Sequence, residues 1–108
     1  MASYQINYDN KGCRKTFKTY KHQEKVIKKA IEKQLIRQLE TDFTKVKLAT
    51  RIEVKGHKCY ECRVNPPQLP PLRIAFIRDQ NTVTVCYMTT NIVKADFTHE
   101  LEHFLGGK

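Results

Sequence analysis

The chain of 108 residues predicts one domain of the α+β class, with an antiparallel sheet of about four strands, two helices that precede most of the sheet and one helix that follows it. Several strand-like runs lie between Arg51 and Asn91, and one long amphipathic stretch extends from His22 to Phe43. No repeat, low-complexity segment or linker divides the chain. We therefore expect residues 1–108 to form a single domain.

The first elements are short. Alternation of apolar and polar residues predicts a strand over Tyr4–Tyr8, and Asp9-Asn10-Lys11-Gly12 is typical of a turn that ends it. The basic stretch from Cys13 to Tyr20 is long enough for one or two helical turns. The order of elements begins with a strand and a short helix.

A long helix is predicted over His22–Phe43. Four apolar residues recur at intervals of four, and no Pro or Gly interrupts them: Ile27, Ile31, Leu35 and Leu39. Lysines and an arginine occupy the other face, so packing of the apolar stripe on the sheet must hold this helix. A last helix is predicted over Asp96–Phe104, with Gly106-Gly107 as its cap.

The strands between Arg51 and Asn91 follow one another through turns. Val83, Val85 and Tyr87 alternate with polar or small residues, which predicts that these three share one face. Asp79-Gln80-Asn81 predicts a tight hairpin, and the proline-rich segment from Asn65 to Pro71 predicts a stiff loop at a sheet rim. These connections are typical of an antiparallel meander.

Strand parity singles out two arginines. If Tyr60, Cys62 and Val64 face a core, then Glu61 and Arg63 face the other way. By the same rule Arg73 points away from Leu72, Ile74 and Phe76. Arg63 and Arg73 are therefore expected on one polar face of neighbouring strands.

The charge balance favours a polyanionic partner. The chain has a net charge of +9, and all of the excess lies before Cys59, because 15 Lys or Arg and 6 acids precede it and 5 of each follow. Such asymmetry favours nucleic acid over a membrane surface, although solvated basic helix faces are common. No apolar leader or spanning segment is present, which predicts a cytoplasmic protein with four reduced cysteines, of which Cys62 and Cys86 are expected in the core.

Three segments resemble the RelE/ParE superfamily of bacterial toxins. They read G-x-x-x-Y-x-x-R, L-R-I-x-F and V-x-V, and they correspond to Gly56 with Tyr60 to Arg63, Leu72 to Phe76, and Val83 to Val85. The resemblance covers most of the chain and implies a RelE-like fold. It also implies the toxin component of a type II toxin–antitoxin system: a metal- and cofactor-independent endoribonuclease that cleaves mRNA, in some relatives on the ribosome, and inhibits translation. An antitoxin protein and mRNA or ribosomal RNA are the implied partners.

The resemblance also assigns roles to individual residues. Arg73 and Arg63 would hold the scissile phosphate, because the guanidinium fork matches phosphate oxygens and stays charged. Glu61 stands where relatives carry a basic residue and would act as a base or orienting group, and Lys94 or His99 would donate the proton. The remaining RNA contacts are assigned to Phe97 by stacking on a base and to lysines by backbone contacts: Lys28, Lys29, Lys55 and Lys58.

Other functions remain open. The chain has Phe97 where relatives tend to have a tyrosine, which leaves a non-catalytic ParE-like toxin or a basic binding module as the alternative. His99-Glu100-Leu101-Glu102-His103 satisfies the HExxH pattern of zinc hydrolases, but a third ligand is not evident and only five residues follow.

A structural zinc site is a further possibility that the spacing disfavours. Cys59 and Cys62 could join His99 and His103 in a Cys2His2 set, yet 36 residues separate Cys62 from His99, whereas zinc fingers have about a dozen. Cys59 and Cys62 would also face opposite sides of a strand. We therefore expect no metal.

Overall fold

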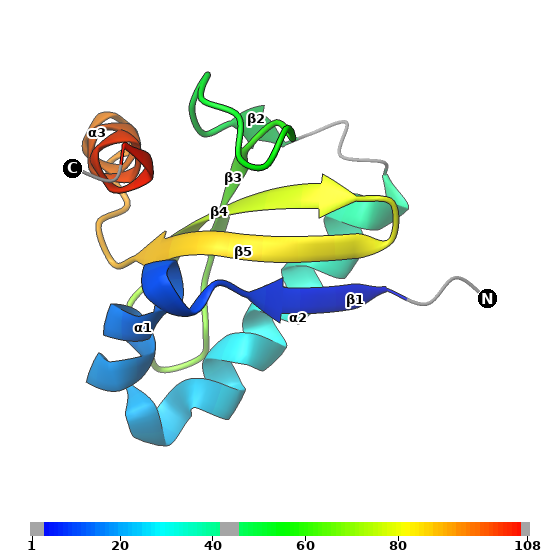
Figure 1. Ribbon diagram of the computed structural model, residues 1–108. Coiled ribbons are helices and arrows are strands. Elements are labelled where there is room, and N and C mark those ends of the chain that lie inside the picture. The colour runs from blue at the N-terminus through cyan, green and yellow to red at the C-terminus, as the bar shows by residue number, and fades with distance from the viewer. Residues whose placement is uncertain (1–3, 42–45, 107–108) are drawn as a thin grey trace.

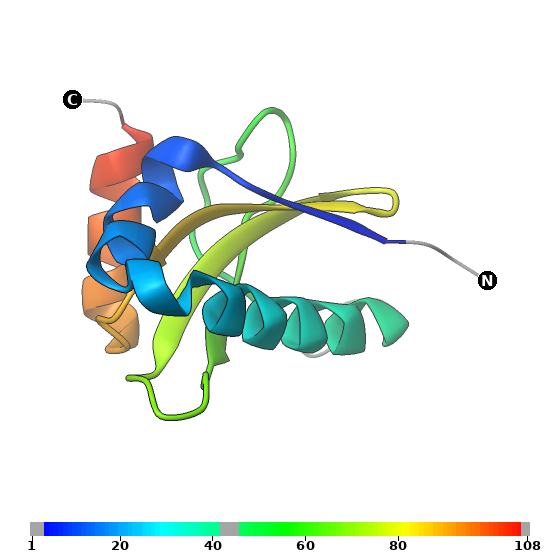
Figure 2. The ribbon, with the colours of Figure 1, turned by 90° about the horizontal axis from the view of Figure 1, so that it is seen from below.

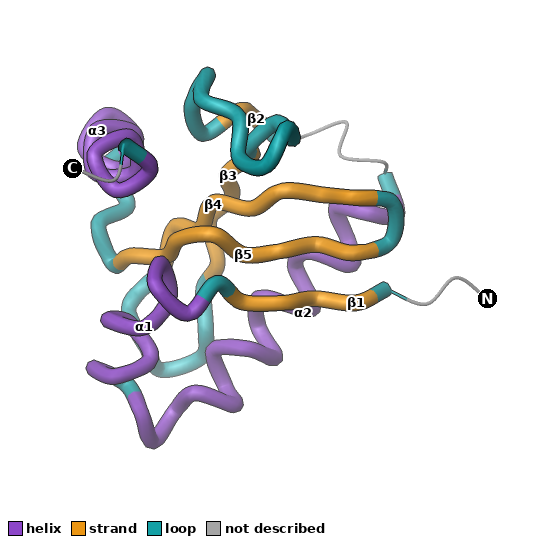
Figure 3. Tube along the Cα trace, in the orientation of Figure 1, coloured by secondary structure: helices purple, strands orange, loops and turns teal. Residues whose placement is uncertain are grey.

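A five-stranded mixed sheet forms the centre of the protein in the computed structural model, which describes residues 4–41 and 46–106. The strands are β1 (Gln5–Tyr8), β2 (Lys47–Leu48), β3 (Tyr60–Val64), β4 (Leu72–Asp79) and β5 (Thr82–Thr89), in the order β1-β5-β4-β3-β2 (Figures 1 and 3). The general α+β class is confirmed. The sheet differs from the expected one because it has five strands and because β1 runs parallel to β5.

Two helices precede β2. Helix α1 spans Asn10–Thr19, a short 3-10 turn, η1, spans Lys21–Gln23, and α2 spans Glu24–Glu40. The predicted turn at Asp9 to Gly12 is wrong, because the Asp9 side chain accepts a hydrogen bond from the Lys11 N–H at 2.9 Å and caps α1. Helix α2 begins two residues later than predicted, and Phe43, the predicted end, lies outside the described residues.

The core has two layers, one on each face of the sheet. On one face, the predicted stripe of Ile27, Ile31, Leu35 and Leu39 on α2 is buried against β4 and β5. On the other face, Phe97 and Leu101 of helix α3 (Lys94–Leu105) pack with Ala75, Cys86 and Cys59. Figure 2 shows α2 beneath the sheet and α3 standing at one end of it.

Helix α3 begins at Lys94, two residues before the predicted start, and Gly106 follows it as the C-cap. Gly107, the other expected capping residue, lies outside the described residues. The connections match the prediction more closely: β4 and β5 form a hairpin closed by Gln80 and Asn81, and the proline-rich loop joins β3 to β4. Among the described residues, no helix has both the length and the apolar character needed to cross a bilayer.

A β-bulge at Cys86 changes the parity of β5. Phe76 pairs with Val85 and Ala75 pairs with Tyr87, so one step along β4 matches two steps along β5. The prediction that Tyr87 shares a face with Val83 and Val85 is therefore wrong. The two valines lie in the α2 layer, whereas Tyr87 packs in the α3 layer.

Helix α1 lies directly against this bulge. The Cys13 thiol donates to the Val85 carbonyl at 3.4 Å, and the Thr16 hydroxyl donates to the Met88 carbonyl at 3.2 Å. Gly12 is the point of closest approach, because a Cβ atom there would stand 1.7 Å from the Cys86 carbonyl oxygen. Glycine is required at this position for space.

Candidate functional site

The two predicted arginines lie side by side. Arg63 of β3 and Arg73 of β4 are direct cross-strand partners, and Glu61 shares their face two residues earlier. The parity prediction for this row is confirmed. All three side chains belong to the face that carries α3.

Arg73 is held by three neighbours. Its Nε donates to the Ile92 carbonyl at 3.0 Å, its guanidinium forms an ion pair with Glu61, and it lies 6.0 Å from the centre of the Phe97 ring. Among the described residues, Nη2 of Arg73 has no hydrogen-bond partner, so this nitrogen is left for a ligand. Arg73 therefore ties the connection between β5 and α3 to the sheet and orients Glu61.

Glu61 is a buried carboxylate, only 5% exposed. Arg73 satisfies Oε1, whereas Oε2 has no hydrogen-bond partner among the residues that the structure describes. A buried charged oxygen without a donor is costly unless a ligand supplies one. Oε2 is itself fully buried, so Glu61 accepts a hydrogen bond or a proton from a bound molecule only when its side chain turns toward solvent.

A cavity of about 340 Å³ lies beside this row, along the edge of β3 that β2 covers only at Tyr60 and Glu61. We call it the β3-edge cavity. Four cations and the Glu61 carboxylate are among the residues that line it: Gln38, Val46, Lys47, Glu61, Cys62, Arg63, Arg73 and Lys94. The excess of positive charge suits a phosphate group, and the carboxylate suits a hydroxyl next to that phosphate.

Lys47 and Gln38 were not expected in this site. Lys47 reaches it because the two-residue strand β2 pairs Lys47 with Glu61 in the antiparallel ladder. Gln38 reaches it from the last turns of α2. No periodicity identifies a strand of two residues, so the sequence gives no signal for Lys47.

The structure separates Lys94 from the other predicted proton donor. Lys94 lines the β3-edge cavity, whereas His99 lines a different cavity with Tyr87 and Glu100. The expectation that Phe97 stacks on an RNA base is wrong, because Phe97 is completely buried between α3 and the sheet. The Phe97 ring instead packs against the guanidinium of Arg73.

The predicted RNA-binding lysines lie in two other regions. Lys28 and Lys29 are on α2, where Lys28 forms an ion pair with Glu24 at 2.9 Å and lies over the rings of Tyr8 and Phe17. Lys55 and Lys58 are exposed in the loop that precedes β3. The structure does not bring these four lysines into the β3-edge cavity.

The groove beside Lys28 is basic. It has a volume of about 470 Å³ between α1 and α2, and its cations are Arg14, Lys18, Lys21 and Lys28. This groove is a second surface suited to a polyanion.

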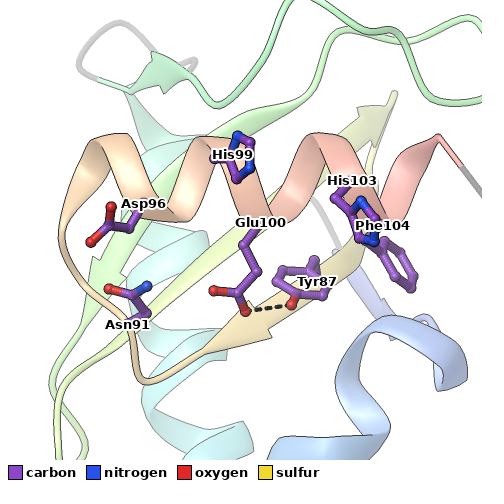
Figure 4. A pocket seen from close by; sticks show the side chains of 7 residues that line it. All are labelled: Tyr87, Asn91, Asp96, His99, Glu100, His103 and Phe104. Carbon is purple, nitrogen blue, oxygen red and sulfur yellow. Dashed lines mark hydrogen bonds between the residues drawn. The ribbon is translucent and has the colours of Figure 1, made fainter. Parts of the chain in front are cut away.

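The HExxH segment lines a larger cavity of about 680 Å³ between α3 and the end of β5, which we call the α3 cavity. Figure 4 shows Glu100 pointing toward Tyr87, and the Tyr87 hydroxyl donates a hydrogen bond to the Glu100 carboxylate. Burial and this carboxylate both raise the pKa of Tyr87. Within residues 4–41 and 46–106, no three His, Cys, Asp or Glu side chains are grouped so that they could hold a metal ion.

The cysteines are protonated thiols at neutral pH. Burial raises the pKa of Cys13, Cys59 and Cys62 to about 12 and that of Cys86 to about 11. Cys59 packs in the α3 layer and Cys62 packs against the α2 layer, so the predicted opposite orientation of the CxxC pair is confirmed. A thiol with so high a pKa is a poor nucleophile and a poor metal ligand.

Comparison with protein-family models, with curated proteins and with solved structures gives no match to this chain. The assignment of function therefore depends on the two cavities and on the sequence motifs.

Proposed function

We propose that this protein is a RelE-like toxin that cleaves mRNA at the β3-edge cavity and so inhibits translation. The observation that carries the proposal is the buried carboxylate of Glu61, with one oxygen lacking a donor among the described residues, surrounded by Lys47, Arg63, Arg73 and Lys94. The motifs around Arg63 and Arg73 agree with the same family. No metal or cofactor is required.

The chemistry needs a base for the ribose 2′-hydroxyl, cations for the phosphate and an acid for the leaving oxygen. Once the Glu61 side chain turns toward the cavity, its Oε2 accepts the 2′-hydroxyl proton, and the 2′-oxygen then attacks the adjacent phosphorus. Arg63 and Lys47, both exposed, bind the phosphate oxygens as negative charge develops. Lys94 donates the proton to the departing 5′-oxygen, and Arg73 positions Glu61 and contributes its Nη2 group.

Within this proposal the protein acts in the cytoplasm, on free mRNA or on the ribosome, and the basic groove between α1 and α2 contacts ribosomal or messenger RNA backbone. In the resting cell an antitoxin with acidic residues covers the cationic surface. The net charge of +9 supports both kinds of partner.

The test is induced expression in bacteria, with growth and the 5′ ends of cellular mRNA measured by primer extension. Wild type is expected to arrest growth and to create new RNA ends. Arg63→Ala and Glu61→Gln are expected to reduce cleavage about a hundredfold, since each removes one group that acts in the transition state. Lys33→Ala is the matched control, because Lys33 is an exposed cation of α2 that lines none of the cavities described. Cleavage unaffected by Arg63→Ala and Glu61→Gln would refute the proposed site.

One observation favours a second candidate, a non-catalytic toxin of the ParE type or a basic binding module. Arg73 is committed to Ile92, Glu61 and Phe97, and the position of Phe97 offers no hydroxyl. Growth arrest without new RNA ends would support this second function and exclude the first.

A further inference from the structure

The α3 cavity has a composition unlike that of the rest of the protein. It is lined by Tyr87, Asn91, Asp96, His99, Glu100, His103 and Phe104, and none of these described residues is Lys or Arg (Figure 4). The β3-edge cavity and the α1–α2 groove, by contrast, are lined by several cations each. In a protein of net charge +9, a lining with two carboxylates and no Lys or Arg disfavours a phosphate and favours a ligand with N–H donors. Two cations, Lys11 and Lys15, line a separate cavity that shares Tyr87 and Glu100 with this one.

The walls of the cavity suit a flat ligand. The rings of Tyr87 and Phe104 pack against each other with centres 4.9 Å apart, and both are only partly buried. They therefore present an aromatic surface on which a base can stack. Glu100 and Asp96 supply acceptors, and the Asn91 amide supplies both a donor and an acceptor.

Residues of the α3 cavity and of the β3-edge cavity lie in one row of the sheet. Glu61, Ala75 and Tyr87 form one row across β3, β4 and β5 on the α3 face. Two strand spacings of about 4.8 Å place the backbones of Glu61 and Tyr87 about 10 Å apart. The row itself is covered, because Ala75 and Phe97 are fully buried, so an RNA strand that joins the two cavities must pass around the β5–α3 connection.

The chain segment that joins the linings of the two cavities carries an exposed apolar side chain. Val93 is 57% exposed, and it lies between Asn91, which lines the α3 cavity, and Lys94, which lines the β3-edge cavity. The β5–α3 connection is itself held to the sheet by the bond from Arg73 to the Ile92 carbonyl. The connection thus forms a fixed ridge over which a nucleotide chain can pass.

We propose that the α3 cavity binds a base of the same RNA strand whose phosphate lies in the β3-edge cavity, and that it selects bases with an amino group over uracil. The inference rests on the proposed function for the identity of the strand. The amino group of adenine, cytosine or guanine offers two hydrogens to the carboxylates of Glu100 and Asp96, which are one helical turn apart, whereas uracil offers only its single N3–H. The cavity therefore sets the sequence preference of the nuclease.

Free nucleosides test the base site without any phosphate. Titration of labelled protein with cytidine and with uridine, followed by NMR, is expected to shift signals of Tyr87, Asn91 and Phe104 with cytidine, with affinity about tenfold weaker for uridine. Glu100→Gln removes the charge but keeps an oxygen for the Tyr87 hydroxyl, and it is expected to abolish the preference. Equal affinity for the two nucleosides, or shifts elsewhere, would overturn the proposal even if the protein cleaves RNA.

All-deoxy oligonucleotides, which lack the 2′-hydroxyl and are not cleaved, test the link between the cavities. Glu100→Gln is expected to reduce the preference for oligo-dC over oligo-dU and to leave the salt dependence of binding unchanged. Lys47→Ala is expected to weaken both oligonucleotides equally and to reduce the salt dependence. Lys33→Ala serves as the control for both.

The outcomes separate the two proposals. Base-selective binding at the α3 cavity in a protein that creates no RNA ends would exclude the nuclease and support the base site. RNA cleavage without base preference would support the nuclease and exclude the base site. A preference unaffected by Glu100→Gln would also exclude the base site, because the selecting group would lie elsewhere.

Discussion

Gly12→Ala is predicted to destabilise the protein, against the usual effect of this change in a helix. In an exposed helix interior, Ala is favoured over Gly by about 1 kcal/mol. Here the new Cβ would stand 1.7 Å from the Cys86 carbonyl oxygen, 2.7 Å from the Cys86 carbonyl carbon and 3.0 Å from the Tyr87 Cα. All three atoms are backbone, so no side-chain rotation relieves the overlap.

The magnitude follows from how α1 is attached. To accommodate the methyl group, α1 must move away from β5 by roughly 1 Å or more. Overpacking of this kind costs about 1–3 kcal/mol. The movement also breaks the bonds from Cys13 to Val85 and from Thr16 to Met88, which are worth about 1 kcal/mol each. After subtraction of the helix-propensity gain, we expect a loss of about 2–4 kcal/mol.

Urea unfolding followed by far-UV circular dichroism measures this loss, with Lys15→Ala as the control because Lys15 is an exposed residue of the same helix. The control is expected to change the free energy of unfolding by less than about 0.5 kcal/mol. A Gly12→Ala protein as stable as wild type, or more stable, would refute the close approach of α1 to the bulge.

Three further predictions concern the site and the core. Arg73→Ala is expected to lower the free energy of unfolding by about 3–5 kcal/mol, because it leaves the buried Glu61 charge unpaired, and adding Glu61→Gln is expected to restore part of the loss in the same urea assay. Lys47→Ala is expected to reduce the slope of log K against log salt by about 0.7 for a single-stranded oligonucleotide, measured by fluorescence anisotropy, and an unchanged slope would remove Lys47 from the phosphate site. Stability is expected to fall as pH rises above about 9, because unfolded thiols lose their protons there whereas burial holds the pKa of Cys13 and Cys59 near 12. The folded state then binds more protons, each thiol costs about 1.4 kcal/mol per pH unit, and a melting temperature that rises between pH 9 and 10.5 would contradict this sign.

The sequence predicts the elements whose signals are local. The four-residue spacing of Ile27 to Leu39 is sufficient for α2, and alternation with turn residues is sufficient for β3, β4 and β5. The same local rule places Arg63, Arg73 and Glu61 on one face. These features need only the pitch of a helix and the pleat of a strand.

The features that the sequence does not predict depend on contacts between distant segments. The strand β2 exists only through its ladder to β3, so Lys47 has no local signature. The bulge at Cys86 moves Tyr87 to the other face of the sheet. The sequence of β5 does not reveal this bulge, because its residue types alternate regularly. The burial of Phe97 and the bond from Arg73 to Ile92 likewise follow from the docking of α3.

The parallel pairing of β1 with β5 has a consequence for biosynthesis. Gln5 to Tyr8 find their ladder partners only in Thr82 to Val85, and the bonds that fasten α1 also end on β5. While the ribosome makes the chain from its amino end, neither this ladder nor these bonds can form until the fifth strand has emerged. Long-range pairing of this kind slows folding, so maturation is a late and concerted event rather than a stepwise one.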